Sequence, residues 1–405
     1  MKIVENKYFA ISLILIIIFY LFYSNLIYDY FVAQDTSKYL GLFRDWIITL
    51  DDTYCEIQSK NDNCRPYQIG PALLYLPFPN LLKIFYYSYL PNLLIVLFVL
   101  SIFLIFHKYY YKNKFLIFCL IFSPTSLFAL ERGNLDLHLF LLAVLICYNR
   151  FFLINLFLIS TSFLLKYYPI TFFLNIFTDN KKSKVFTISS FFLTVLLSFL
   201  IIFYHSEIFI DLFSNLSASK AGYHFIYSIK SFAKILKYLF SFNYIILLII
   251  TYLFFIYLTY KFVRLNYKNN LDKIISLTTI EEKLFLIGTN ISLFAYLLFS
   301  NIFYREIFLI LTIPLLIKFR DELKFIKVFK LIIFFIIFRY LFLHIHNYTL
   351  LTENHYHENG IRVFHDSFVF TLAIKSILDY FLMAFLASLV FFQNFKIIRS
   401  LFYKF

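Results

Sequence analysis

The sequence is a succession of apolar runs separated by short polar segments, and several runs are long enough to cross a lipid bilayer. The chain is 61% hydrophobic with a mean hydropathy of +0.78, well above the values of soluble proteins. We therefore expect an all-α polytopic membrane protein in which residues 1–405 form a single integral membrane domain. The expected membrane segments are Tyr8–Tyr28, Leu90–Phe106, Phe115–Leu130, Leu135–Tyr148, Val185–Tyr204, Asn243–Tyr260, Leu284–Ser300, Ile307–Ile317, Leu331–Ile345 and Phe368–Phe392.

Positive charge sets the expected orientation, because Lys and Arg collect in the cytoplasmic loops of membrane proteins. The net charge of +14 is therefore read as a topology signal rather than as a sign of a nucleic-acid partner. No small-residue cleavage site follows the first run, so a retained helix is expected rather than a signal peptide. An inside amino terminus puts several polar segments on the outer side: Asp35, Glu131–Asp136, Lys166, Tyr304–Glu306 and the His-rich loop 344–366.

The first outer loop, residues 29–89, is polar and acidic and is expected to contain interfacial helices. Asp35 follows the first span closely, where a carboxylate can act as a general base on an acceptor hydroxyl. By local sequence the stronger interpretation is a helix cap for Thr36–Trp46, since Asp is a preferred N-cap residue. Cys55 and Cys64 lie in the same loop and can form a disulfide if it faces an oxidising compartment.

A short polar segment, Glu131–Asp136, interrupts the apolar run Phe115–Cys147 with three ionisable side chains. Charged groups at membrane depth are costly, and they are usually paired, turned toward a wet cavity and functional. Gly133 permits a tight turn that a larger residue would resist. The alternative is a short polar turn between two helices in which Glu131 and Arg132 form a local ion pair.

Residues Phe151–Thr178 are too few for two full spans, which need about 40 residues. Basic residues border this segment on both sides, so we expect a short re-entrant hairpin with Lys166–Pro169 near its tip. One long tilted helix is the alternative. Lys166 could hold an anionic phosphate at the tip as a point charge, or it could snorkel to the membrane interface.

A short outer turn, Tyr304–Glu306, contains Arg305, which suits a phosphate or a carboxylate. A local ion pair between Arg305 and Glu306 is the alternative. The histidines of the last outer loop match no strong zinc pattern, so no metal site is expected. The P-loop, dinucleotide-binding and nucleophile-elbow motifs are absent, and no cofactor is expected.

Two further groups of charged residues are spaced three or four residues apart, as on one face of a helix. Lys375 and Asp379 lie four residues apart in the last apolar run, which predicts an internal ion pair. Three lysines share one helical face in Ser228–Phe240, which predicts a helix lying at the membrane interface. These lysines are Lys230, Lys234 and Lys237.

Three short blocks of the sequence belong together: Phe122–Pro124 with Leu130–Asp136, then Leu165–Pro169, and finally Asn301–Leu309. In this order and on a common side of the membrane, they resemble glycosyltransferase family 87. Members of that family are GT-C membrane enzymes that use polyprenyl-phosphate sugars, typified by alpha-1,2-mannosyltransferases. The likeness covers most of the chain in topology, and in sequence it is confined to these short blocks.

The resemblance implies a GT-C-like bundle of roughly 10–12 transmembrane helices that includes the re-entrant hairpin. It also implies an acidic catalytic residue early in the first outer loop, a position that Asp35 matches, so Asp35 is the expected general base. Cations beside the leaving phosphate would stabilise its developing charge, and Lys166, Arg305 and Arg132 are the candidates. The residues expected to orient the substrate are Glu131, Asn134, Asp136, Tyr304 and Glu306.

The expected function is transfer of a hexose, such as mannose, from a polyprenyl-phosphate donor to a lipid or glycan acceptor. The expected location is a bacterial inner membrane, with the active site facing the periplasm or exterior and with membrane lipids as further partners. Two alternatives stay open, a polytopic transporter or lipid flippase and a polymerase of surface glycans. Transporters tend to hold polar groups near the midplane between repeats, whereas these groups cluster toward one side and no repeat is visible.

Overall fold

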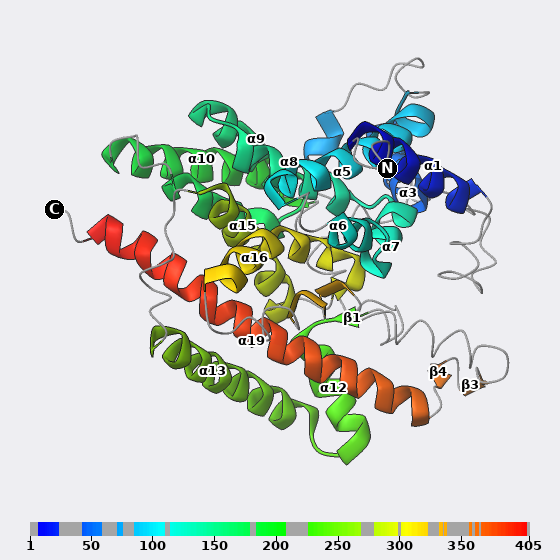
Figure 1. Ribbon diagram of the computed structural model, residues 1–405, viewed down its shortest axis with the longest axis vertical. Coiled ribbons are helices and arrows are strands. Elements are labelled where there is room, and N and C mark those ends of the chain that lie inside the picture. The colour runs from blue at the N-terminus through cyan, green and yellow to red at the C-terminus, as the bar shows by residue number, and fades with distance from the viewer. Residues whose placement is uncertain are drawn as a thin grey trace. The chain divides into compact units, whose positions relative to one another are not determined.

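The computed structural model of the chain is almost entirely helical (Figure 1). Its described residues form two compact units. Unit 1 comprises Met1–Tyr167 and Val195–Ser217, and unit 2 comprises Tyr168–Thr194 and Ala218–Phe405. The structure describes residues 7–23, 43–58, 71–75, 85–109, 114–178, 184–207, 226–268, 279–298, 301–322, 332–334, 336–337, 356–358, 361–363 and 366–402.

Unit 1 is a group of mostly short helices that ends with the second half of α10. Its long buried helices are α5 and α8, which pack against each other through Phe98 and Phe140, with ring centroids 5.5 Å apart. The elements are α1 (Lys7–Tyr23), α3 (Arg44–Gln58), η2 (Pro71–Tyr75), η3 (Phe85–Tyr89), α5 (Leu90–Ile105), η4 (His107–Tyr109), α6 (Lys114–Ile121), α7 (Pro124–Arg132), α8 (Leu135–Tyr148), α9 (Phe152–Leu165) and α10 (Lys184–Tyr204).

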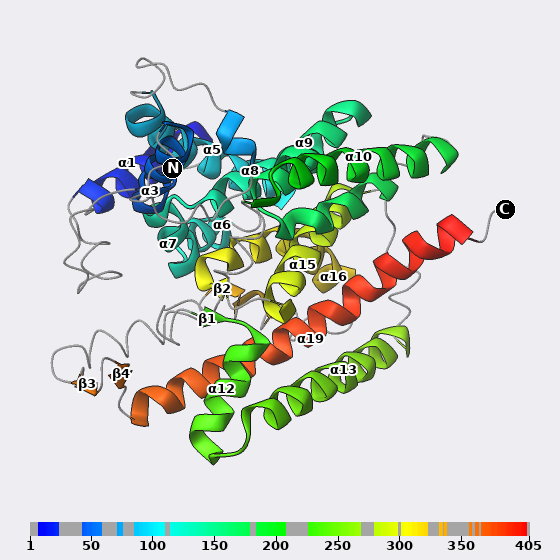
Figure 2. The ribbon, with the colours of Figure 1, turned by 180° about the vertical axis from the view of Figure 1, so that it is seen from behind.

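Unit 2 is organised around α15, which is buried along nearly its whole length and contacts η5, η7, α16 and α19. Helix α19 runs beside α13 and crosses α12, as both views of the ribbon show (Figures 1 and 2). Two antiparallel two-stranded ribbons, β1 with β2 and β3 with β4, complete it. The elements are η5 (Tyr168–Thr178), the first half of α10, β1 (Ile226–Tyr227), α12 (Ile229–Phe240), α13 (Tyr244–Lys268), α15 (Ile280–Leu298), β2 (Asn301–Ile302), η7 (Phe303–Thr312), α16 (Ile313–Glu322), β3 (Tyr356–Glu358), β4 (Ile361–Val363) and α19 (Asp366–Phe402).

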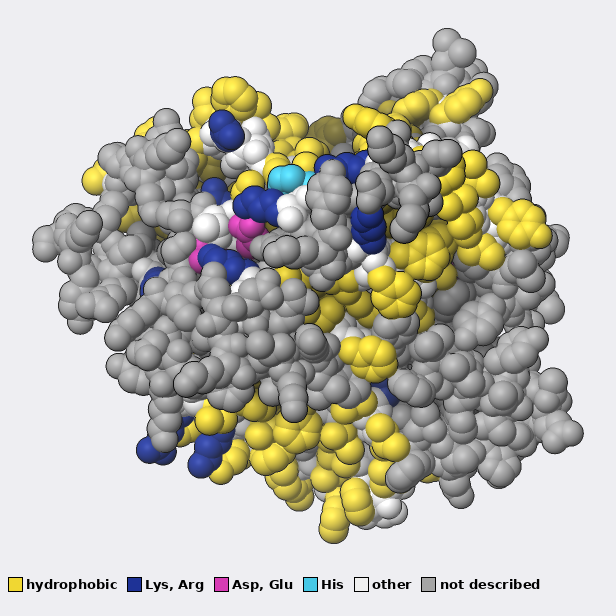
Figure 3. All heavy atoms as spheres, in the orientation of Figure 1, with side chains coloured by type: hydrophobic (Ala, Val, Ile, Leu, Met, Phe, Trp, Pro, Cys, Tyr) yellow, Lys and Arg dark blue, Asp and Glu magenta, His cyan; other side chains and the backbone are white. Residues whose placement is uncertain are grey.

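Among the described helices, three are long and apolar enough to cross a membrane. They are Val185–Tyr204 in α10, Tyr244–Asn266 in α13 and Ala373–Ile397 in α19, and the pair α6–α7 makes a fourth if it counts as one broken span. Helices α10 and α13 expose apolar side chains along most of their length, a surface suited to lipid tails. Apolar side chains also cover much of the lower part of the face drawn in Figure 3. The chain is therefore an α-helical membrane protein. The expected spans at α1, α5 and α8 are shorter helices, and so is α9 in the expected hairpin.

The expected span Phe115–Leu130 is broken, because α6 and α7 differ in direction by 42°. Pro124 stands in the first turn of α7, where its missing N–H costs nothing, and it could not continue α6. Ser123 caps α7 by accepting a hydrogen bond from the backbone N–H of Ser126 at 3.3 Å. The expectation of one continuous helix was therefore wrong at this point.

Two other expected segments differ from a plain membrane helix. Ile307–Ile317 is not one α-helix, because η7 is a 3₁₀ helix that passes into α16, and both are buried within unit 2. The expected hairpin Phe151–Thr178 contains α9 and η5, which belong to different units, so the hairpin stays a prediction. The chain does leave the helical conformation at Lys166–Tyr167, where the tip was expected.

The expected ion pair between Lys375 and Asp379 is confirmed in α19. Lys375 Nζ lies 2.9 Å from Asp379 Oδ2, and the two side chains are 4% and 3% exposed. A hydrogen bond also joins α13 to α19, because Asn266 of α13 donates to Ser388 Oγ of α19 at 2.8 Å. Such hydrogen bonds add to packing between membrane helices.

Gly288 allows η7 to lie close against α15. A Cβ at this position would lie 2.6 Å from the carbonyl oxygen of Phe308 and 2.8 Å from Leu311 Cβ. Because the first of these contacts is with backbone, Gly288→Val is expected to force η7 away and to lower the unfolding midpoint by roughly 5–10 °C. Thermal unfolding of the detergent-solubilised protein measures this. Ser292→Ala, one turn later in α15, is the matched control, and equal midpoints for the two variants would contradict the close-packing interpretation.

Candidate functional site

Three helix ends meet at the segment Glu131–Asp136 in unit 1. Gly133, with a φ of 56°, takes the left-handed conformation that ends α7. Asn134 then caps α8 by accepting a hydrogen bond from the backbone N–H of Asp136 at 3.3 Å. The short turn 149–151 sends α9 back along α8, so the end of α9 returns to the first turn of α8.

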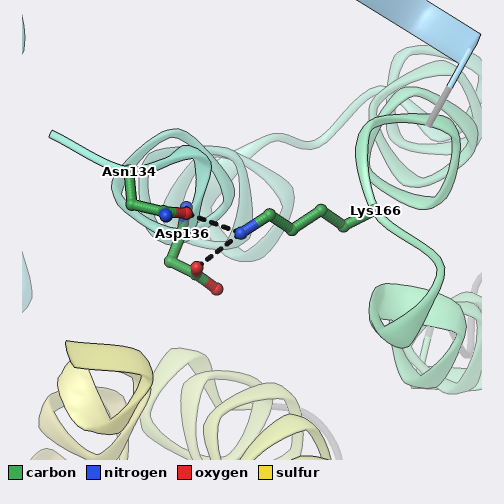
Figure 4. Close-up of polar contacts among 3 residues, drawn as sticks. All are labelled: Asn134, Asp136 and Lys166. Carbon is green, nitrogen blue, oxygen red and sulfur yellow. Dashed lines mark hydrogen bonds and ion pairs between the residues drawn. The ribbon is translucent and has the colours of Figure 1, made fainter. Parts of the chain in front are cut away.

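Lys166, the residue that ends α9, reaches the first turn of α8 (Figure 4). Its ammonium nitrogen Nζ lies 2.6 Å from Asn134 Oδ1 and 2.6 Å from Asp136 Oδ2. The side chain of Asp136 is 1% exposed and that of Lys166 is 13% exposed. The pair is therefore largely desolvated, and a desolvated ion pair is stable only with good geometry and additional hydrogen bonds, which Asn134 supplies.

Glu131 and Arg132 form the local ion pair that the sequence left open. Arg132 Nε lies 3.6 Å from Glu131 Oε2, and the Glu131 side chain is 2% exposed. The Arg132 guanidinium also lies over the ring of Phe128, 5.3 Å from its centroid. A second pair of opposite charges therefore lies at the end of α7, directly before the turn that contains Asn134.

The start of α3 packs against the same turn. The backbone N–H of Phe43 donates to the carbonyl of Glu131 at 2.8 Å, and Phe43 is fully buried. A Cβ at Gly133 would lie 2.0 Å from Phe43 Cδ1, so this ring as well as the left-handed backbone requires glycine. Phe43 itself has a φ of 64°, a conformation that a bulky residue keeps only when its surroundings hold it.

Trp46 and His138 join α3 to α8 beside the cluster, and the sequence pattern did not single out either residue. Their ring centroids are 4.5 Å apart, and Trp46 Nε1 donates to the carbonyl of Tyr86 at 3.0 Å. Both ring nitrogens of His138 are buried, and neither meets a hydrogen-bond partner with good geometry among the described residues, although the Asn134 backbone is near. The one available signal was a histidine inside an apolar run, four residues after Asn134.

The described part of residues 29–89, the segment expected as the first outer loop, has two further cross-links. The hydroxyl of Tyr87 donates to Asp51 Oδ1 at 2.5 Å. Burial, helped by this hydrogen bond, raises the pKa of Tyr87 above its ordinary value, so the phenol stays neutral at physiological pH. Cys55 in α3 is disulfide-bonded, whereas the other two described cysteines are free. Cys64 lies outside the described residues.

The remaining candidate residues lie elsewhere. Arg305 and Glu306 lie in the first turn of η7 in unit 2. The Arg305 guanidinium lies over the ring of Tyr168, 5.0 Å from its centroid. Glu306 is 2% exposed. Asp35 and the side chain of Tyr304 lie outside what the structure describes.

The structure thus assembles one charge-balanced polar cluster from the predicted residues. Lys166 and Arg132 supply the donors, and Asn134, Asp136 and Glu131 supply the acceptors. Such a set can hold a polyhydroxylated ligand with an anionic group, because it presents both signs of charge in a desolvated place. Within the described residues, no three His, Cys, Asp or Glu side chains come together as metal ligands.

Comparisons of the chain with protein-family models, with curated proteins and with solved structures found no match. A functional assignment therefore depends on the geometry of the polar cluster and on the sequence blocks that surround it.

Proposed function

We propose that the chain is a membrane glycosyltransferase that moves a hexose, such as mannose, from a polyprenyl-phosphate donor to a lipid or glycan acceptor. The observation that carries this proposal is the buried contact of Lys166 with Asn134 and Asp136 at the ends of apolar helices. A lipid-linked sugar needs hydrogen-bonding groups for its hydroxyls, a cation for its phosphate and apolar surface for its chain. The cluster and the helices around it offer all three.

Asp35 is the proposed general base. It would take the proton of the acceptor hydroxyl while the hydroxyl oxygen attacks C1 of the sugar, and the bond from C1 to the phosphate oxygen would break. Phe43 anchors the same chain segment at the Glu131 carbonyl. Asp35 lies eight residues before it (43 − 35), so even a fully extended chain keeps Asp35 within about 28 Å of that contact.

Lys166, Arg305 and Arg132 are the proposed cations for the leaving phosphate. A positive group in a desolvated site acts more strongly on developing charge than it would in water. Lys166 is held in place by its contacts before any ligand binds, so little ordering would accompany phosphate binding. Asn134, Asp136, Glu131, Tyr304 and Glu306 are the proposed residues that orient the substrate.

For the architecture we propose the GT-C-like bundle of roughly 10–12 membrane helices, with a re-entrant hairpin ending at Lys166–Pro169. The helix breaks at Ser123–Pro124 and at Lys166–Tyr167 support it, since broken helices at membrane depth occur where they line a cavity. The proposed location is a bacterial inner membrane with the site facing the periplasm or exterior. The disulfide at Cys55 supports an oxidising compartment on that side.

A transfer assay read by mass spectrometry tests the reaction. Purified protein is incubated with polyprenyl-phosphate-hexose donors and a pool of lipid and glycan acceptors. The expected result is a product heavier by one hexose, together with free polyprenyl phosphate. Ladders of products would favour the glycan polymerase instead. The proposal would be contradicted if every hexose donor gave no product and also showed no slow hydrolysis.

One observation favours the alternative of a transporter or lipid flippase. The buried pair Lys375–Asp379 lies inside the candidate span of α19, and ionisable residues within membrane spans often mark a transport pathway. Proteoliposomes containing the purified protein distinguish the two functions. Movement of a sugar or lipid across the bilayer without covalent change would support transport.

His138 is expected to contact the sugar. Its buried ring nitrogens are oriented beside the cluster without a good partner in the described protein, so a donor hydroxyl can pair with one of them. His138→Phe keeps the ring against Trp46 and removes this hydrogen bond, which is expected to raise the KM for the donor about tenfold. Steady-state kinetics measure this KM. His107→Phe, which replaces an exposed ring in η4, is the control. An unchanged KM in a folded variant would argue against the contact.

A further inference from the structure

Helix α12 leads directly into a membrane-spanning helix. Ser241, with a φ of 56°, ends α12, and the candidate span in α13 begins at Tyr244. Both views of the ribbon show the two helices meeting at one sharp corner (Figures 1 and 2). Because a spanning helix enters the hydrocarbon at its first residues, this corner lies at the membrane surface.

The two sides of α12 differ in chemistry. One side is buried in unit 2, and the other carries lysines at intervals of four and three residues. Lys230 donates to the carbonyl of Leu298 at 2.8 Å, so the first of them ties α12 to the end of α15. Lys234 and Lys237 continue the same face toward the corner. The buried side consists of Ile229, Ser231, Phe232, Ala233 and Ile235.

Aromatic side chains project from the corner itself. Tyr238 is 57% exposed, Phe240 is 59% exposed and Phe242 is 63% exposed. Aromatic rings at such a position are favoured at the level of lipid headgroups, where an apolar body and a polar surrounding meet. The corner therefore combines rings that suit the interface with two lysines of the last turns of α12.

The charged residues of α12 and α13 are all basic. No Asp or Glu occurs between residues 226 and 268. A basic, aromatic surface fixed at the membrane interface is complementary to lipid headgroups that carry a net negative charge. Zwitterionic headgroups offer no such net attraction.

We propose that Lys234 and Lys237, with the exposed rings of the α12–α13 corner, form a binding site for the headgroups of anionic phospholipids. The site lies in unit 2 and is independent of the glycosyl transfer proposed for the chain. Its occupant is a phospholipid of the surrounding bilayer, held by charge at the phosphate and by ring contacts at the acyl boundary.

Lipid binding to the purified full chain tests the proposal. The protein in detergent is titrated with phosphatidylglycerol and, separately, with phosphatidylcholine of the same acyl chains, and bound lipids are counted by native mass spectrometry. The native protein is expected to prefer phosphatidylglycerol. The variant with Lys234→Gln and Lys237→Gln is expected to bind it about 25-fold more weakly, about fivefold per lysine, with phosphatidylcholine binding unchanged.

Lys261→Gln is the matched control, because Lys261 lies on α13 over the ring of Tyr257 and away from the corner in sequence. It is expected to leave phosphatidylglycerol binding unchanged. If the double variant does not fold, the exposed Lys237→Gln alone is expected to weaken binding about fivefold. Equal binding of the two lipids by the native protein, or an unchanged affinity in a folded Lys234 and Lys237 variant, would overturn the proposal.

Discussion

Replacing Lys166 with Met is expected to abolish hexose transfer and to destabilise unit 1. The substitution would leave the Asp136 carboxylate, 1% exposed, without the ammonium that lies 2.6 Å from it. Removing one partner of a buried ion pair costs about 3–5 kcal/mol, because the remaining charge stays desolvated. Thermal unfolding and the transfer assay on Lys166→Met measure the two losses.

A second substitution separates the structural effect from the catalytic one. Asp136→Asn combined with Lys166→Met removes both charges and is expected to restore most of the unfolding midpoint. Transfer should nevertheless stay at least about 100-fold below that of the native protein, because the proposed cation for the phosphate is still missing. Recovery of both stability and transfer would show that the Lys166–Asp136 pair serves only the fold.

Replacing Asp35 with Asn is expected to lower the rate of transfer by about 100- to 10,000-fold, the usual contribution of a general base. The amide has nearly the shape of the carboxylate but cannot accept the proton of the acceptor hydroxyl. Donor binding and the unfolding midpoint should stay unchanged, since the substitution affects proton transfer alone. The measurement is kcat with saturating donor and acceptor.

Asp51→Asn is the control for this second prediction. Asp51 is an exposed carboxylate of α3, and an amide oxygen in its place can still accept the hydrogen bond from Tyr87. Its turnover is expected to match that of the native protein. Normal turnover by Asp35→Asn would remove Asp35 from the mechanism and direct attention to the acidic residues of the Lys166 cluster.

Local chemistry made parts of the structure predictable from sequence. A glycine followed by Asn134 specifies a helix end and a new helix cap, so the turn between α7 and α8 could be expected. The spacing of Lys375 and Asp379 likewise needs only the period of one helix. The contact of Lys166 with Asn134 and Asp136 joins two of the predicted polar segments, and its role in transfer stays a prediction.

Contacts between distant segments could not be predicted. Trp46 and His138 are 92 residues apart (138 − 46), and nothing in either local sequence indicates that their rings meet. The close approach of η7 to Gly288 of α15 is a contact of the same kind, because neither local sequence indicates it. The break at Ser123–Pro124, in contrast, had a readable signal, since serine before proline often begins a helix.

The docking of Phe43 against Gly133 has a consequence for biogenesis. The ribosome makes Gly133 90 residues after Phe43 (133 − 43), which takes about 5–18 s at 5–20 residues per second. During that interval α3 has been synthesised but lacks the surface on which Phe43 and its left-handed backbone are held. The segment that contains α3 therefore has to be kept from misfolding until α7 and the turn at Gly133 have been made.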